Sequence, residues 1–106
     1  MKLKPGVKVE SLLKHVQQDL SILEAVFLGH DLEFVLTSTT DDSPPRPLPA
    51  HREGRAVDIR ARQVNPYLLP VIKKEIETAL KGKVIVKVVI AYPETARTHV
   101  HVEWPA

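Results

Sequence analysis

The sequence of 106 residues contains no cysteine. This absence excludes disulfide-stapled scaffolds, thiolate zinc fingers, iron–sulfur clusters and any mechanism that uses a cysteine nucleophile. No uninterrupted apolar stretch approaches the roughly 20 residues that a membrane-spanning helix needs. The first residues, MKLKPGV, are followed by no apolar stretch of the length found in signal peptides. We therefore expect a protein that is made in the cytoplasm without an export signal of its own.

An excess of charge of one sign is also absent. There are 15 Lys and Arg against 13 Asp and Glu, so the formal net charge is +2. This near balance argues against a dedicated nucleic-acid-binding protein. Hydrophobic residues make up 43% and charged residues 26%, a globular composition, and the length suits one domain with a modest core. We expect a single domain over residues 1–106, with neither nucleic acid nor membrane as a partner.

The spacing of apolar residues predicts two helices. Residues 11–29 carry apolar side chains on one helical face, with Ser11 suited to the N-cap. Residues 65–81 begin with Asn65-Pro66, a capping residue followed by proline at the first helical position. A glycine lies close to the C-terminal end of each segment, where it would end the helix.

Alternating and β-branched residues predict four strands. They cover residues 33–38, 56–60, 83–91 and 98–104, and a proline-rich loop over 39–50 separates the first two. The third of these strands is apolar almost throughout, which predicts that it is well buried. The element order favours an α+β domain in which a small, mostly antiparallel sheet is flanked by two helices.

The last predicted strand gathers titratable side chains on one face. Strict alternation over 98–104 leaves the other face to threonine, valine and tryptophan. The polar face carries His99, His101 and Glu103. A solvated outer surface and a functional site are both consistent with this pattern. In the same way, Glu103 either holds an imidazole or faces solvent.

A second candidate group precedes and enters the strand 56–60. His51 lies in the loop, and Gly54 permits a turn that returns this histidine toward Asp58. A plain hydrophilic loop is the alternative, but an aspartate in so short a strand should face groups that stabilise its charge. Imidazole and carboxylate are zinc ligands, and a catalytic zinc site has three protein ligands and one water. His51, Asp58 and either His99 or His101 would supply that set.

The two motifs, HREGRAVDIR and THVHVEW, resemble the zinc D-alanyl-D-alanine carboxypeptidase family, which shares its fold with the hedgehog N-terminal signalling domain. The family pattern His-x-x-Gly-x-Ala-x-Asp is complete between His51 and Asp58, and the later His-x-His is complete at 99–101. The segment 37–42 is similar to the end of the preceding strand in phage-encoded and hedgehog-like members. The resemblance covers about residues 33–104.

The resemblance implies a zinc metallopeptidase that hydrolyses peptide bonds in peptidoglycan stem or cross-link peptides. The enzyme would be either a carboxypeptidase or an endopeptidase of the endolysin type. A phage-encoded enzyme that reaches the cell wall after release also fits this expectation. His51, Asp58 and His101 would bind one Zn²⁺ per chain. Glu94 would be the general base toward a zinc-activated water, and His99 would steady the tetrahedral intermediate.

The sequence departs from the family where many members carry an arginine that holds the substrate carboxylate. No arginine is present in the corresponding segment 38–42. Arg46, Arg55 and Arg60 are candidates for this role, and the sequence does not choose between them. Two other functions stay open: a non-catalytic, hedgehog-like zinc-binding module, and a phage structural protein that zinc stiffens.

Overall fold

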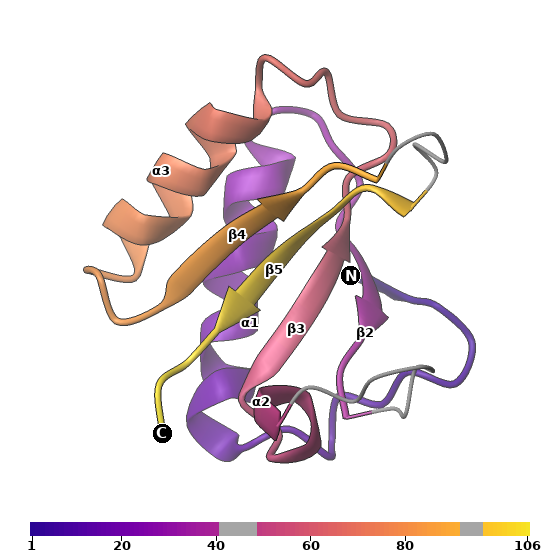
Figure 1. The fold of residues 1–106 in the computed structure, drawn as a ribbon, viewed down its shortest axis with the longest axis vertical. Helices are drawn as coiled ribbons and strands as arrows, with labels where there is room; N and C mark the ends of the chain where they lie inside the picture. The colour runs from indigo at the N-terminus through magenta and orange to yellow at the C-terminus, as the bar shows by residue number, and fades with distance from the viewer. Residues whose placement is uncertain (41–48, 92–96) are drawn as a thin grey trace.

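A computed structural model describes residues 1–40, 49–91 and 97–106 (Figure 1). Helices and strands alternate along most of the chain. In order, the elements are β1 (Lys2–Leu3), α1 (Lys14–Leu28), β2 (Val35–Ser38), α2 (Pro49–Arg52), β3 (Ala56–Arg60), α3 (Leu69–Ala79), β4 (Ile85–Val89) and β5 (His99–Glu103). None of the helices in the described ranges combines the length and apolarity needed to cross a bilayer.

The strands form one five-stranded sheet in the order β1-β2-β3-β5-β4. The α+β class is therefore confirmed, but the prediction of a mostly antiparallel sheet was wrong because the sheet is mixed. β1 runs parallel to β2, whereas the pairs β2–β3, β3–β5 and β4–β5 are antiparallel. With only two residues, β1 is too short to show an alternating pattern in the sequence.

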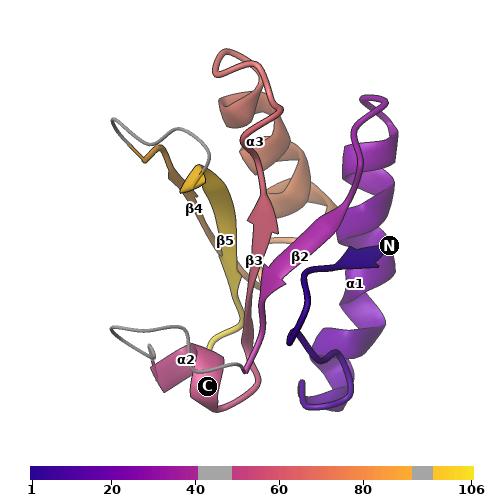
Figure 2. The ribbon, with the colours of Figure 1, turned by 90° about the vertical axis from the view of Figure 1, so that its right-hand side faces the viewer.

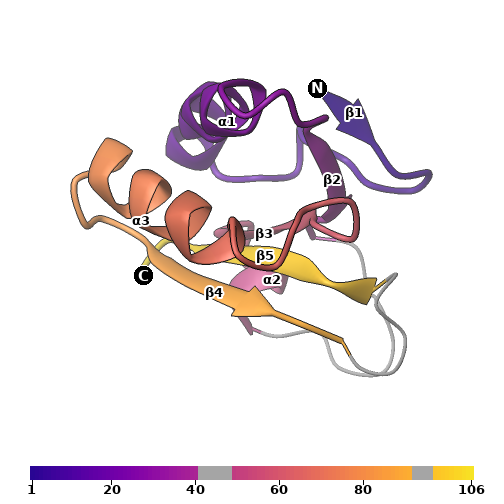
Figure 3. The ribbon, with the colours of Figure 1, turned by 90° about the horizontal axis from the view of Figure 1, so that it is seen from above.

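Two helices, α1 and α3, lie on the same face of the sheet, as Figure 3 shows. The short helix α2 lies on the opposite side, within a segment that the sequence predicted to be loop (Figures 2 and 3). The two predicted helices thus flank the sheet on one face. The other face is left open for polar side chains.

The hydrophobic core fills the space between this helical layer and the sheet. The rings of Phe27 and Phe34 meet edge to face with centroids 5.5 Å apart. The predicted inward face of β5 is confirmed, because Val100 and Val102 are fully buried. The helices contribute to the same core with Val16, Leu20, Leu23, Phe27, Leu69, Ile72 and Ile76. The core therefore occupies the helical side of the sheet, away from the histidines of β5.

Three local predictions differ from the structure. α1 begins at Lys14, because the Ser11 hydroxyl bonds the Lys8 carbonyl and the Thr40 hydroxyl instead of capping the helix. α3 begins at Leu69, since the preceding residues form turns around Asn65. β4 is not well buried: it is an edge strand, and its alternate residues are exposed at Ile85, Lys87 and Val89.

Candidate metal centre

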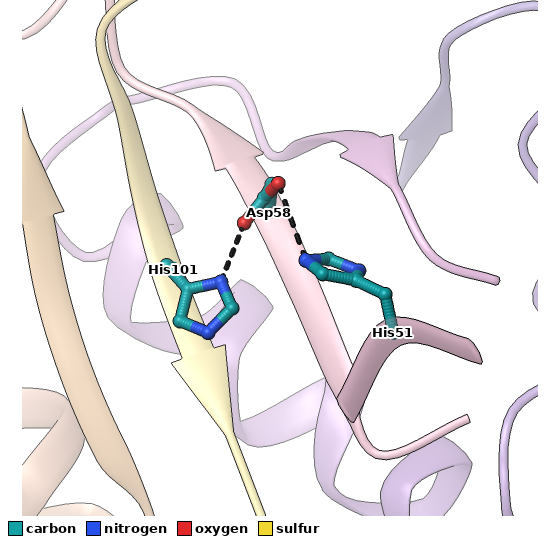
Figure 4. A group of neighbouring side chains, drawn as sticks. All are labelled: His51, Asp58 and His101. Carbon is teal, nitrogen blue, oxygen red and sulfur yellow. Dashed lines mark hydrogen bonds and ion pairs between the residues drawn. The ribbon is translucent and has the colours of Figure 1, made fainter. Parts of the chain in front are cut away.

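The candidate site lies on the open face of the sheet, where two neighbouring strands meet α2. Asp58 of β3 and His101 of β5 are direct partners across the antiparallel pair. Cross-strand partners project to the same face and stand close together. His51 comes from α2 and approaches Asp58 from the other side (Figure 4). Three separate elements therefore deliver the three predicted metal ligands to one place.

A tight turn after α2 positions His51. The Gly54 amide donates to the His51 carbonyl at 3.0 Å, and Gly54 has a φ of +76°. A side chain at this position would also meet the Ser11 carbonyl oxygen at 3.0 Å. Only glycine fits both the backbone conformation and this close approach. The turn predicted from the sequence is thus present, and it returns the histidine to the strand that follows.

The ligand atoms converge on the Asp58 carboxylate. His101 Nδ1 lies 2.8 Å from Asp58 Oδ1, and His51 Nε2 lies 3.4 Å from Asp58 Oδ2 (Figure 4). The two imidazole rings are 5.2 Å apart between centroids. One ligand atom from each of the three residues lies within 4.8 Å of the others. Both histidines are buried, with 6% and 5% of their surface exposed, so their positions are fixed by packing.

Outer contacts orient both imidazoles. His51 Nδ1 donates to the Thr39 carbonyl at 2.7 Å, because a carbonyl oxygen only accepts. This leaves Nε2 facing Asp58, where it donates a hydrogen bond to the carboxylate and, after losing that proton, would offer its lone pair to a metal ion. His101 Nε2 lies 3.1 Å from Glu103 Oε1, and its Nδ1 donates to Asp58 Oδ1; after losing that proton, Nδ1 would offer its lone pair to a metal ion. Of the two alternatives for Glu103, contact with an imidazole is the one observed.

The electrostatics of the group keep the carboxylate charged. Burial disfavours the ionised form of Asp58, but hydrogen bonds from His101 and His51 outweigh it and hold its pKa well below the usual range. Burial likewise disfavours the charged form of His101. Its hydrogen bonds to Asp58 and Glu103 outweigh that effect and raise the pKa of His101. Asp58 is therefore available as an anionic ligand throughout the neutral range.

This donor set fits a metal ion. Two imidazole nitrogens and one carboxylate oxygen are zinc ligands, and around a tetrahedral zinc such atoms stand about 3.4 Å apart. The observed separations have the same scale. Other divalent ions also accept nitrogen and oxygen donors, so the geometry supports a metal site without specifying zinc.

The remaining predicted residues differ in their relation to the site. His99 lies at the rim, with Nε2 3.9 Å from Asp58 Oδ1. Arg55 contacts Glu53, Glu103 and the Trp104 carbonyl, so it stabilises the C-terminal end of β5. Arg60 lines a cavity beside Asp58. The predicted base Glu94 and the candidate anchor Arg46 both lie outside the described residues. The contact of the Thr39 carbonyl with His51 could not be predicted, because a backbone contact carries no side-chain signature.

Glu103→Gln is expected to weaken zinc binding by about 10- to 100-fold, the usual loss when a group that orients a ligand is removed. Glutamine keeps the shape but offers His101 a weaker, uncharged acceptor. Competition with a chromophoric chelator measures the affinity. Glu53→Gln is the matched control, since Glu53 also contacts Arg55 but is exposed and is not part of the buried group of His51, Asp58 and His101. An equal loss in both variants would show that Glu103 acts only through Arg55.

Zinc affinity is expected to fall as the pH is lowered from about 8 to about 5, where histidines take up protons. Protons compete with the metal for His101, and its raised pKa starts that competition at a higher pH than at an ordinary histidine. Asp58, with its lowered pKa, stays ionised over this range. Dissociation constants measured across the range test this, and a flat profile would contradict it. In Glu103→Gln the loss of zinc affinity should occur at a lower pH, because the hydrogen bond to Glu103 helps to raise the pKa of His101.

Comparison of the chain with models of protein families, with curated proteins and with solved structures found no match in any of the three. The resemblance to zinc carboxypeptidases therefore remains a prediction based on the two sequence motifs. What the structure adds is the convergence of His51, Asp58 and His101 into a group able to hold a metal ion.

Proposed function

We propose that this chain is a zinc-dependent peptidase that hydrolyses peptide bonds in peptidoglycan stem or cross-link peptides. The observation that carries the proposal is the buried group of His51, Asp58 and His101. Structural zinc sites take four protein ligands, whereas catalytic sites take three and keep one position for water or substrate. Among the described residues this group has three members. The peptidoglycan substrate is supported by the resemblance of the two motifs.

The surroundings of the group favour a site that a substrate can reach. α1 and α3 cover the opposite face of the sheet (Figure 3). Asp58 and His99 line a cavity of about 430 Å³ on the open face. His99 is 29% exposed at its side chain, while the two histidine ligands are almost fully enclosed. A peptide bond brought to this cavity would thus lie beside Asp58 and His99.

The proposed roles of the residues follow from their contacts. Bound zinc would supply a Lewis acid that polarises a carbonyl and lowers the pKa of water to about 7. Asp58, His51 and His101 would hold the ion, with the imidazoles oriented by the Thr39 carbonyl and Glu103. His99 would steady the tetrahedral intermediate, as the resemblance implies.

In this proposal Glu94 is the general base. Its carboxylate would take a proton from the water as the new carbon–oxygen bond forms, which gives the tetrahedral intermediate. It would then deliver this proton to the amine nitrogen as the carbon–nitrogen bond breaks. The assignment rests on the family resemblance, in which the base comes shortly before the His-x-His strand.

Glu94→Gln is expected to lower peptidoglycan hydrolysis by at least about 100-fold, because general-base catalysis contributes about 10²–10⁴-fold. Its zinc content should stay at one ion per chain, since Glu94 is not among the proposed ligands. Release of soluble peptides and free D-alanine from purified peptidoglycan measures turnover. Glu77→Gln on α3 removes the same charge from the opposite side of the sheet and should behave as wild type.

Two results would contradict parts of this proposal. Undiminished turnover in Glu94→Gln would remove Glu94 from the mechanism. A wild-type protein with one zinc per chain that cleaves no wall preparation would overturn the peptidase function. The non-catalytic zinc-binding module and the phage structural protein would then be the functions to test.

A further inference from the structure

The cavity beside Asp58 is rich in positive charge. Its lining includes the basic residues Lys4, Arg60, Arg62 and Arg97, whereas Asp58 is the one acidic residue among the described residues that line it. That carboxylate already contacts His51 and His101. Without Arg97, the lining still has three basic residues and one acidic residue. A concave surface with this balance attracts negative charge.

The cations come from separate parts of the chain. Arg60 lies two positions beyond Asp58 on β3, so both side chains project to the same face. Lys4 follows β1, and its amide bonds the Leu36 carbonyl of β2 at 2.9 Å. Arg62 follows β3, and Arg97 precedes β5. The fold of the sheet, and not one run of basic sequence, therefore brings these charges together.

Among residues 1–40, 49–91 and 97–106, the neighbouring acidic groups leave this charge largely uncompensated. The hydrogen bond and the charge of Lys2 lower the pKa of the nearby Glu33 carboxyl, and the charge of Arg60 adds a smaller effect in the same direction. The main partner of Glu33 is Lys2, whose Nζ lies 2.8 Å from it, and Glu33 is exposed to solvent. Glu33 does not line the cavity. The surplus of cations is thus a property of the cavity itself.

We propose that this cavity binds a phosphate group. A single carboxylate would neutralise one cation, whereas a phosphate monoester or free phosphate carries about two negative charges at neutral pH. Guanidinium groups match phosphate oxygens with paired hydrogen bonds. Thr98 also lines the cavity, and its hydroxyl, which accepts from the Ala91 amide at 3.3 Å, can donate its proton to a further oxygen. This inference goes beyond the proposed peptidase function and does not depend on it.

The test is a titration of the chelator-treated full-length chain with inorganic phosphate, followed by amide NMR shifts. Treatment with a chelator prevents phosphate from binding to a metal. Saturable shifts are expected at Thr37, Thr98 and His99, and Arg60→Gln and Arg62→Gln should each weaken binding by about tenfold. Lys74→Gln is the matched control, because it removes one exposed cation from α3 on the other side of the sheet.

Acetate and phenyl phosphate complete the experiment. Acetate at equal ionic strength should bind at least about tenfold more weakly than phosphate. Binding of phenyl phosphate as tight as that of phosphate would identify an esterified group as the ligand, and binding of phosphate alone would identify the free ion. Equal affinity for acetate would overturn the proposal, as would unchanged phosphate affinity in both arginine variants. Arg62 is exposed, so its variant tests the cavity even if Arg60→Gln fails to fold.

Discussion

Asp58→Asn is expected to weaken zinc binding by more than about 100-fold, because loss of a group that only orients a ligand already costs about 10- to 100-fold. Asp58 is the centre of the site: its two oxygens face His101 Nδ1 and His51 Nε2 at 2.8 and 3.4 Å. It is also the one anionic ligand of the three. Asparagine keeps the shape and removes the charge, so the effect on metal affinity is separated from packing.

His99→Ala is the matched control for this experiment. His99 lies on the same face and within 3.9 Å of Asp58, but it is not one of the three converging ligands. Its variant should keep one zinc per chain, as measured by metal analysis after dialysis. A loss of zinc in His99→Ala with retention in His101→Ala would show that the ligand and the helper histidine are exchanged.

Removal of zinc is expected to lower the melting temperature by at least about 15 °C while leaving a cooperative transition. A free zinc concentration 1,000-fold above the dissociation constant stabilises the folded state by about 4 kcal/mol. For a domain of this size, each kcal/mol corresponds to roughly 4 °C or more. The metal-free chain should still fold, because its core lies between the sheet and the helices α1 and α3, away from the site.

Calorimetry of the protein with zinc and with a chelator measures both parts of this prediction. Asp58→Asn is the control, and its melting temperature should respond little to zinc. A chelated wild-type chain without a cooperative transition would show that the metal is needed for folding. That result would favour the phage structural protein in which zinc stiffens the core.

The sequence predicted best the features that depend on residues close together in the chain, such as the alternation of side chains along a strand. The alternation over 98–104 placed His101 and Val100 on the correct faces of β5, and β3 has the predicted bounds. The motif from His51 to Asp58 indicated a turn, and the structure has that turn at Gly54. Residues that lie within a few positions of one another are governed by backbone geometry, which a sequence displays directly.

Features that depend on distant parts of the chain could not be predicted. The parallel pairing of β1 with β2 and the exposure of the edge strand β4 follow from the strand order, which no local pattern encodes. Contact between the Thr39 carbonyl and His51 involves the backbone, which has no sequence signature. The cavity containing Lys4 and Arg97 likewise exists only because the sheet brings both ends of the chain together.

An anomalous difference map of zinc-loaded crystals, recorded at the zinc absorption edge, tests the central claim most directly. The metal site predicts one peak per chain at about 2.0–2.2 Å from His51 Nε2, an Asp58 carboxylate oxygen and His101 Nδ1. A peak at other residues, or no peak in crystals grown with zinc, would contradict the assignment of these three side chains as metal ligands.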